Sequence, residues 1–284
     1  MKVRMLGPHG DRLRAHAERW GVVLDERTIK TANALIAFGR RAADPVALKI
    51  VKDEGDEWRS GEIVRAFGGR GMLRALEFDD GAILLERLMP GESLVDVVLR
   101  GDDDEATSIV ARIIAELSPD SPPSGVPTLA EWGRSFERYQ SSGDDQIPKS
   151  VVDEAAAHFA ELCNTQKDRR LLHGDLQHTN ILFDDRRGWL AIDPKGVIGE
   201  REFEVCAFLR NPIQAPRFFT DLTAVERRLR LACDKARLSY ERALRWVFAG
   251  AILSAIWGVE DDGFVRGDNP SLILARTVRP AIRN

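Results

Sequence analysis

Residues 171–200 read LLHGDLQHTNILFDDRRGWLAIDPKGVIGE. Two histidines, an aspartate and an asparagine fall within HGDLQHTN, from His173 to Asn180. A short apolar run, a turn and a second apolar run follow, and the second run ends on Asp193. This pattern predicts a polar loop followed by a β-hairpin. Groups able to bind a metal ion lie in both parts.

Zinc is the first ligand that two neighbouring histidines suggest. His173, Asp175 and His178 could bind it, but the helical zinc motif needs histidines four residues apart on one face. Here the two histidines are five apart, and Gly174 and Thr179 disfavour a continuous helix. A zinc-dependent hydrolase therefore stays open only as the weakest interpretation.

Phosphoryl transfer needs a different set of groups. A carboxylate orients the attacking hydroxyl, while amide and carboxylate oxygens hold the magnesium ions that bridge the phosphates. Asp175 and Asn180 have the spacing of the kinase pattern D-L-x-x-x-N, with Leu176 in place. Asp193 ends the next apolar run, where a metal-binding carboxylate is expected. These oxygen ligands predict a magnesium site beside a catalytic aspartate.

A lysine must also hold the nucleotide phosphates. The run PVALKIV places Lys49 in an apolar strand, where an unpaired ammonium group is costly to bury. Considered alone, Lys49 is better explained as a surface lysine on an edge strand. The helix predicted after it carries Glu57 near its start and Glu62 near its middle. We expect Glu62 to be the partner of Lys49 because of that central position.

The character of the chain changes after Leu88. Before it, apolar runs alternate with turns, DDG predicts a hairpin, and one helical pattern lies near 53–69. After it, MPGES interrupts the chain, Ser93 is expected to cap a helix from Leu94, and most spacings are helical. The helices are expected at 105–117, 129–139, 150–163, 224–235, 239–259 and 271–282. We predict an α+β fold with a β-rich lobe at 1–88, a helical lobe at 89–284 and a ligand cleft between them.

Composition narrows the classes of partner. The formal net charge is −4 and the pI about 5.8, so no general basic field favours nucleic acid or an anionic membrane. The three cysteines form no CxxC pair, which fits a reduced cytoplasmic protein. The N-terminus has no apolar core typical of a secretory signal. The longest apolar run, 246–259, predicts a buried helix. We expect a monomer or small homo-oligomer.

The stretch LHGDLQHTNILF…WLAIDPKGVIGE resembles the phosphotransferase loop of the aminoglycoside and choline kinase group, H-G-D-x-x-x-x-N followed by I-D. Within that group it is most similar to the streptomycin 6-phosphotransferase and hydroxyurea phosphotransferase family. The segments GRGMLRAL, AILLERL and LSAIW…DDG resemble that family as well, so the similarity runs roughly from residue 24 to residue 263. The resemblance implies a protein-kinase-like fold, with ATP and Mg²⁺ used to phosphorylate an aminoglycoside.

The resemblance also implies roles for the residues of the loop and hairpin. Asp175 would be the catalytic base, and Asn180 and Asp193 would bind Mg²⁺. His173 would support the loop by hydrogen bonding. No role is implied for His178.

In the first lobe, the resemblance implies the nucleotide contacts. Lys49 would bind the ATP phosphates, held by Glu62, and the backbone of Glu86, Arg87 and Leu88 would meet the adenine. The segment TIKTANALIAFGRR, which would cover the phosphates, lacks the pattern G-x-G-x-x-G and turns near residues 31–33.

A cationic acceptor such as streptomycin, which carries guanidinium groups, calls for an acidic site. Glu200 and Glu202 follow the catalytic hairpin, and Asp261 lies in the acidic turn VEDDG. Trp257, just before that turn, could stack on a sugar or a guanidinium group. For each single carboxylate, a solvated surface position is the more frequent explanation.

Two other functions stay open. A kinase of another small hydroxylated metabolite, or of hydroxyurea, would use the same catalytic residues. A nucleotide-binding regulator that has lost catalysis is disfavoured because Lys49, Asp175, Asn180 and Asp193 are all present.

Overall fold

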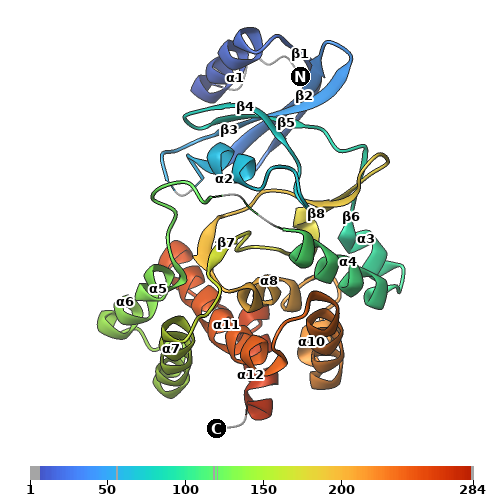
Figure 1. Cartoon of the computed structure of the whole chain (residues 1–284). Coiled ribbons are helices and arrows are strands. Elements are labelled where there is room, and N and C mark those ends of the chain that lie inside the picture. Colours follow the sequence, from blue (N-terminus) through green and yellow to red (C-terminus); the bar gives the residue numbers. More distant parts are fainter. Residues whose placement is uncertain (1–6, 56, 118, 120, 283–284) are drawn as a thin grey trace. The chain divides into compact units, whose positions relative to one another are not determined.

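The computed structural model describes residues 7–55, 57–117, 119 and 121–282 (Figure 1). The outer ends of the two expected lobes, residues 1 and 284, lie outside this range. The chain forms two compact units. Unit 1 comprises 1–92, 118–123 and 182–195, and unit 2 comprises 93–117, 124–181 and 196–284. The hairpin that carries Asp193 thus packs with the N-terminal segment, and a boundary at residue 88 stays a prediction.

Unit 1 is built on a five-stranded antiparallel sheet with the order β1-β2-β3-β5-β4. Its strands are β1 (Val22–Lys30), β2 (Ala34–Arg41), β3 (Asp44–Val51), β4 (Ala75–Asp79) and β5 (Ala82–Glu86). The DDG hairpin between β4 and β5 is confirmed, since Gly81 takes the left-handed conformation with φ of +64°. A smaller sheet, β6-β8-β9, consists of β6 (Pro90–Ser93), β8 (Ile181–Asp184) and β9 (Gly188–Ala191).

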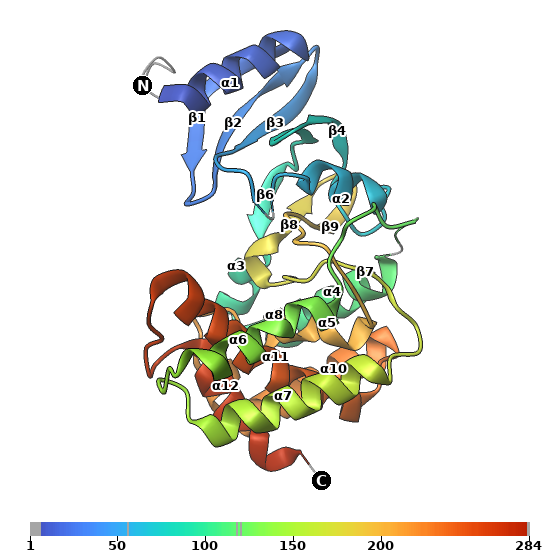
Figure 2. The same cartoon turned by 90° about the vertical axis from the view of Figure 1, so that its left-hand side faces the viewer.

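Two helices accompany the large sheet. Helix α1 (Gly7–Arg19), which the sequence did not predict, lies beside β1 and β3 (Figure 2). Its Leu13 and Ala17 belong to the same buried cluster as Leu48 and Ile50 of β3. Side chains alternate between the two faces of a strand, so Lys49 points to the other face. Helix α2 (Ser60–Ala66) is shorter than predicted and begins only after the segment that carries Glu57.

Unit 2 is mainly helical, as predicted. Its helices are α3 (Leu94–Leu99), α4 (Asp103–Glu116), α5 (Leu129–Trp132), α6 (Arg134–Ser142), α7 (Lys149–Asn164), α8 (Val205–Leu209), α9 (Arg217–Thr220), α10 (Leu222–Ala236), α11 (Tyr240–Asp262) and α12 (Pro270–Val278). Short 3₁₀ turns η2 (His178–Asn180), η3 (Arg201–Glu204) and η4 (Arg279–Ala281) join them. The Ser93 side chain accepts a hydrogen bond from the Val95 amide and caps α3 as expected.

Helix α11 is the core helix of unit 2 (Figure 1). It packs against α6, α7, α8, α10 and α12. Ser239 caps its start, and Gly263, with φ of +76°, ends it. Among the described helices it alone is long and apolar enough to cross a membrane by length and composition, but 67% of that stretch is buried inside the structure. This confirms the buried helix predicted from the apolar run.

A two-stranded ribbon in unit 2 positions the predicted catalytic loop. Strand β7 (Arg170–Leu172) pairs with β10 (Val197–Gly199), with Leu172 opposite Val197 and Arg170 opposite Gly199. The loop that begins at His173 leaves one end of this ribbon. The segment that begins at Glu200 leaves the other end.

Candidate active site

Asp175 lies in the loop between β7 and β8, and neighbouring side chains hold both of its carboxylate oxygens. Oδ1 is 3.3 Å from the Arg210 guanidinium, and Oδ2 accepts hydrogen bonds from Gln177 Nε2 at 3.1 Å and Asn180 Nδ2 at 3.2 Å. The side chain nevertheless stays 18% exposed. It is fixed in orientation yet open to an incoming hydroxyl.

Asn180 is turned so that its amide nitrogen faces the loop. Nδ2 also donates to the Asp175 carbonyl oxygen at 2.9 Å. The amide oxygen makes no hydrogen bond within the part of unit 2 that the structure describes. An amide oxygen is a ligand that Mg²⁺ accepts. Because its Nδ2 faces Asp175 and its amide oxygen is left for a metal ion, Asn180 fits the predicted role of a Mg²⁺ ligand.

His173 and Glu204 lie beneath the loop. The His173 side chain is completely buried, and its Nδ1 accepts the Asp175 backbone N–H at 3.2 Å, which is the supporting position expected for it. Glu204, at the end of η3, accepts the His173 N–H on Oε1 at 2.6 Å and the Gly174 N–H on Oε2 at 3.1 Å. Burial raises the pKa of Glu204 to about 7, although the two N–H donors oppose that shift. This one carboxylate therefore holds the backbone of the loop at both His173 and Gly174.

His178 is fixed from the far side of the loop by Arg228 of α10. Arg228 is fully buried, and its NH2 nitrogen lies 3.3 Å from His178 Nε2 and 2.9 Å from the Asn211 carbonyl oxygen. Burial lowers the pKa of His178 well below its usual range, and the Arg228 charge adds to the effect. A neutral His178 that accepts this hydrogen bond has no free Nε2 for a metal ion. Its place is structural, and the zinc interpretation loses one ligand.

Arg228 also has a buried counter-ion. Its Nε is 3.3 Å from Asp103 Oδ1, and Asp103 is 4% exposed. Its guanidinium lies over the rings of Phe208 and Phe218. The guanidinium is thus paired and stacked, yet burial still lowers the pKa of Arg228 to about 10.

In unit 1, Lys49 forms two ion pairs on the face of the sheet opposite α1. Its Nζ is 2.6 Å from Asp193 Oδ1 and 2.8 Å from Glu57 Oε2, and Lys49 is only 6% exposed. Burial alone would lower the pKa of Lys49, but Asp193 and Glu57 together raise it above its usual value. The ammonium group is therefore held charged, as a phosphate-binding lysine requires.

The Asp193 side chain is partly exposed, and its backbone adopts an uncommon conformation. Its side chain is 51% exposed, and its φ of +57° is uncommon for a residue other than glycine. Oδ1 is engaged by Lys49, while Oδ2 has no hydrogen bond within the described residues of unit 1. This oxygen fits a magnesium ligand. Backbone strain of this kind clusters at functional sites.

The expected pairing of Lys49 with Glu62 is wrong. Glu62 pairs with Arg59, its neighbour on the exposed side of α2, and Glu57 takes the place at Lys49. The reason is that α2 begins at Ser60. Glu57 therefore lies in the preceding turn, which brings it to β3.

Glu57 also contacts the turn expected to cover the phosphates. Its Oε1 accepts a hydrogen bond from Asn33 Nδ2 at 3.2 Å. Asn33 lies between β1 and β2, in the turn predicted at residues 31–33. One carboxylate thus links this turn to Lys49.

The predicted adenine-binding segment follows β5. The Glu86 amide donates to the Arg74 carbonyl at 3.1 Å, and the Arg87 amide donates to the Pro45 carbonyl at 3.2 Å. The Leu88 amide has no such partner within the part of the chain that the structure describes. Of the three expected contacts, Leu88 is the one whose N–H remains available, so the adenine role of this segment stays a prediction.

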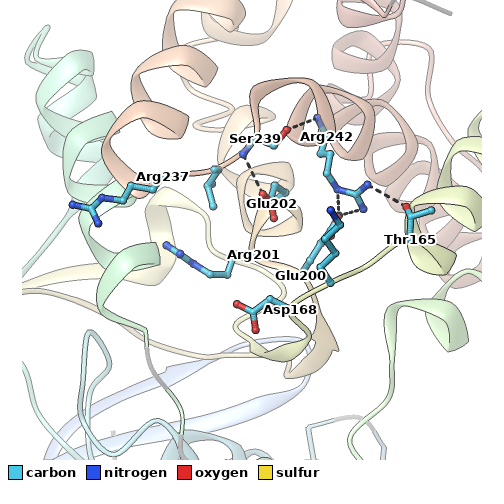
Figure 3. A pocket seen from close by; sticks show the side chains of 10 residues that line it. Thr165, Asp168, Glu200, Arg201, Glu202, Arg237, Ser239 and Arg242 are labelled. Carbon is cyan, nitrogen blue, oxygen red and sulfur yellow. Dashed lines mark hydrogen bonds and ion pairs between the residues drawn. The ribbon is translucent and has the colours of Figure 1, made fainter.

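The proposed acceptor carboxylate Glu200 needs correction. It is 5% exposed, and it accepts hydrogen bonds from Arg242 Nε at 3.0 Å and NH2 at 2.6 Å (Figure 3). The Trp246 indole N–H also donates to it. Its charge is therefore balanced inside unit 2. Glu200 also follows the end of the β7–β10 ribbon opposite to the end at which the catalytic loop begins.

Glu202 lies in the same region. Its Oε1 accepts the Ser239 amide at 3.1 Å, and it lines a pocket of about 440 Å³ that Arg201, Arg237 and Asp168 also line (Figure 3). The pocket shares the far end of the ribbon with Glu200. A role for Glu202 in binding the acceptor stays a prediction that this placement does not favour.

Trp257 and Asp261 lie at the C-terminal end of α11. The Trp257 indole N–H donates to Ser135 Oγ at 3.0 Å, and its ring meets Trp132 edge to face with centroids 5.1 Å apart. Asp261 is exposed. Trp132 itself lies against Gly174, because a Cβ on Gly174 would be 2.9 Å from its Cη2 atom. Of the two tryptophans, Trp132 is thus the one that touches the loop.

Several residues of this site escaped the sequence interpretation: Glu57 as partner of Lys49, Trp132, Glu204, Arg210 and Arg228. Glu204 offered a signal, since it is a carboxylate next to the apolar run VCAFL. The others have no local signature, because their partners lie far away along the chain.

Comparison with known proteins adds independent findings. A family described as "Aminoglycoside/hydroxyurea antibiotic resistance kinase" matches residues 19–263. The chain is 33% identical over 250 residues to streptomycin 3''-kinase of Klebsiella pneumoniae, covering 86% of this chain and 91% of the relative. It is 34% identical to hydroxyurea phosphotransferase of Kitasatospora aureofaciens, with 86% and 71% covered. It is 33% identical to streptomycin 6-kinase of Streptomyces griseus, with 80% and 74% covered.

A solved structure confirms the fold. Aminoglycoside phosphotransferase APH(4)-Ia, in a ternary complex with AMP-PNP and hygromycin B, superposes with a TM-score of 0.66 at 15% identity. The superposition covers 96% of this chain and 99% of that one. The predicted α+β, protein-kinase-like fold is therefore confirmed.

Proposed function

Because this chain belongs to the aminoglycoside/hydroxyurea antibiotic resistance kinase family, we propose that it transfers the γ-phosphate of ATP to a hydroxyl of a streptomycin-like aminoglycoside. The chain is an ATP-dependent phosphotransferase with an alcohol group as acceptor. The observation that carries the proposal is Asp175, held on both oxygens yet still exposed.

Asp175 acts on the acceptor. Its carboxylate accepts the proton of the attacking hydroxyl and orients the oxygen toward the phosphorus. Gln177, Asn180 and Arg210 fix the carboxylate so that little reorganisation is needed during transfer. The buried pair of His173 and Glu204 keeps the backbone of the loop in place.

Lys49 acts on the nucleotide. Its ammonium group, kept charged by Glu57 and Asp193, binds phosphate oxygens of ATP. Asn180 and Asp193 would hold Mg²⁺, and each has an oxygen suited to it. When bound, this ion neutralises charge on the phosphates.

The test is a panel of acceptors in an ADP-release assay. It contains streptomycin, a second aminoglycoside with no guanidinium group, hydroxyurea, choline and simple polyols. We expect ADP release to depend on streptomycin. Mass spectrometry of the product should show one added phosphate, and NMR should identify the hydroxyl, since the relatives' names place it at either 3'' or 6.

Hydroxyurea is the second candidate acceptor, because a relative of that name is 34% identical to this chain. Turnover of hydroxyurea without turnover of streptomycin would replace our proposal. Phosphorylation of choline or a polyol alone would indicate another metabolite kinase.

Asp175→Asn is the matched control for catalysis. We expect turnover to fall by at least about 10²-fold while Mg-ATP binding and the melting temperature change little. Turnover near the wild-type rate would refute the role of Asp175. Failure of the wild type to bind Mg-ATP would refute all of these kinase functions, including phosphorylation of hydroxyurea or another metabolite.

The setting of the reaction is part of the same proposal. We place the enzyme in the cytoplasm, where ATP and Mg²⁺ are supplied, as a monomer or small homo-oligomer. Cell fractionation and light scattering on the purified chain test these two points.

A further inference from the structure

Trp132 lies directly beside the catalytic loop. It is the last residue of α5, and its ring carbon Cη2 lies 2.9 Å from the position that a Cβ on Gly174 would occupy. Gly174 has φ of +78° and immediately precedes Asp175. No larger residue would fit between the indole and the loop. The indole edge therefore borders the backbone that presents the catalytic carboxylate.

The neighbours of Trp132 fix its ring. It meets Trp257 at 87° with centroids 5.1 Å apart, and Phe203 at 62° with centroids 6.0 Å apart. The capping box of Thr128 and Glu131 fixes the start of α5. Thr128 also forms an isolated parallel β-bridge with Ile198 of β10. Trp132 is thus a rigid wall and does not need to reorganise when a ligand arrives.

The indole is nevertheless partly exposed to solvent. Trp132 is only partly buried, unlike Trp246, which is completely buried in the same aromatic cluster. Its Nε1–H has no hydrogen bond within the described residues and is not among the buried polar atoms that lack a partner. A buried indole N–H almost always finds a partner. This N–H therefore opens to solvent and is free to donate to a ligand.

Trp257 has a different position. Its indole N–H is used by Ser135, which also contacts Arg138 and Glu260. Trp257 therefore cannot offer that donor to an acceptor without losing this bond. Trp257 instead packs edge to face against Trp132 and helps to hold the Trp132 ring in place.

We propose that Trp132 contacts the acceptor, stacking its indole face on a hydroxylated or cationic group and donating its in-plane N–H to an oxygen on a neighbouring part of the same molecule. The proposal rests on the function proposed above and names the residue that selects the substrate class. Aromatic faces attract saturated rings through their C–H groups and guanidinium groups through their charge. A wall beside Asp175 would hold such a ring with its hydroxyl at the carboxylate.

The test compares Trp132→Leu, which removes both the face and the N–H, with Trp132→Phe, which keeps an aromatic face. For Trp132→Leu we expect the KM for streptomycin to rise ~10-fold or more. Trp132→Phe should recover part of that loss. The KM for ATP should change much less than the KM for streptomycin. Trp20→Leu removes a half-buried indole from unit 1 and is the control.

A merely structural role gives another pattern. It would lower the melting temperature and kcat and change acceptor-independent hydrolysis, with the KM for streptomycin constant. That result, or an unchanged streptomycin KM in Trp132→Leu, overturns the proposal while streptomycin kinase activity stands.

Calorimetric titration of streptomycin into wild type and Trp132→Leu, both with Mg-AMP-PNP, separates binding from turnover. Weaker binding in the variant supports the proposal. If the wild type neither binds nor phosphorylates any acceptor in the panel, the proposed function and this inference both fail.

Discussion

Replacing Glu204 by Gln tests whether one buried carboxylate carries the catalytic loop. In the structure, each carboxylate oxygen accepts one backbone N–H, from His173 at 2.6 Å and from Gly174 at 3.1 Å. A glutamine offers one oxygen and one NH₂ group. The NH₂ group would face a backbone donor, so one N–H would lose its partner at a residue only 3% exposed.

The size of the effect follows from that lost hydrogen bond. A buried donor left without a partner costs about 1–3 kcal/mol. We expect the free energy of unfolding of Glu204→Gln to fall by about 2 kcal/mol at pH 5, where the wild-type side chain is also neutral. The loop would shift as well, and we expect kcat to drop by about 10- to 100-fold because Asp175 loses its alignment.

The pH dependence has a definite sign. Burial raises the pKa of Glu204 in the folded chain to about 7 from an ordinary 4.5, so its ionisation opposes folding. The stability linked to the protonated form is fully present below pH 4.5 and is lost as pH rises toward about 7. The raised pKa corresponds to about 3 kcal/mol of stability lost with rising pH, a loss that Glu204→Gln cannot undergo because glutamine does not ionise. The difference between wild type and variant should therefore shrink between pH 5 and pH 8.

The assay is urea unfolding at pH 5, 6.5 and 8, with steady-state kinetics at each pH. Glu202→Gln changes a more exposed residue two positions earlier on the same 3₁₀ turn; it is the control and should stay within about 0.5 kcal/mol of the wild type. If Glu204→Gln matches the wild type in stability and kcat, the loop does not depend on Glu204. If the stability difference does not change with pH, the raised pKa is refuted.

Five more substitutions, two of them controls, test the ion pairs. Glu57→Gln should raise the KM for ATP about tenfold because Lys49 loses a partner, while Glu62→Gln should leave it unchanged; the reverse result in steady-state kinetics would restore the pairing expected from the sequence. Lys49→Met should lower kcat/KM for ATP by at least about 10²-fold with little change in melting temperature, and near-normal kinetics would exclude phosphate binding by Lys49. Arg228→Met should cost about 3–5 kcal/mol in urea unfolding, because Asp103 would lose its fully buried partner and the Asn211 carbonyl oxygen would lose its hydrogen-bond donor. Arg227→Gln should cost less, although Arg227 also pairs with Asp103, because the Arg227 side chain is half-exposed. Equal losses for the two arginine variants would show that burial does not decide the cost.

The loop and hairpin could be predicted because their signals are local. The spacing of Asp175, Asn180 and Asp193 is a property of one short stretch. The caps and turns that set the surrounding elements, such as Ser93 and the DDG hairpin, are equally local. The long apolar pattern of α11 was recognisable for the same reason.

The first helix could not be predicted, because little in its sequence points to burial. Helix α1 is mostly polar and buries only Gly10, Leu13 and Ala17. It is stabilised by packing on the sheet, a contact that no local pattern reveals.

The exact partners of charged residues were also beyond the sequence. The choice of Glu62 over Glu57 failed because it depended on where α2 begins, and helix ends are the least certain part of a pattern. Glu200 was assigned to the acceptor because Arg242, which neutralises it, lies 42 residues further along the chain. Sequence position alone cannot show such a contact.

The buried guanidinium of Arg228 has a consequence for how the protein is synthesised. It reaches His178 of the catalytic loop from 50 residues further along the chain, and Asp103 from well before it. A nascent chain that has released the loop but not α10 lacks the group that joins these segments. We therefore expect the loop to be fixed only after α10 has been synthesised, and a chain truncated before α10 should leave the loop open to proteases.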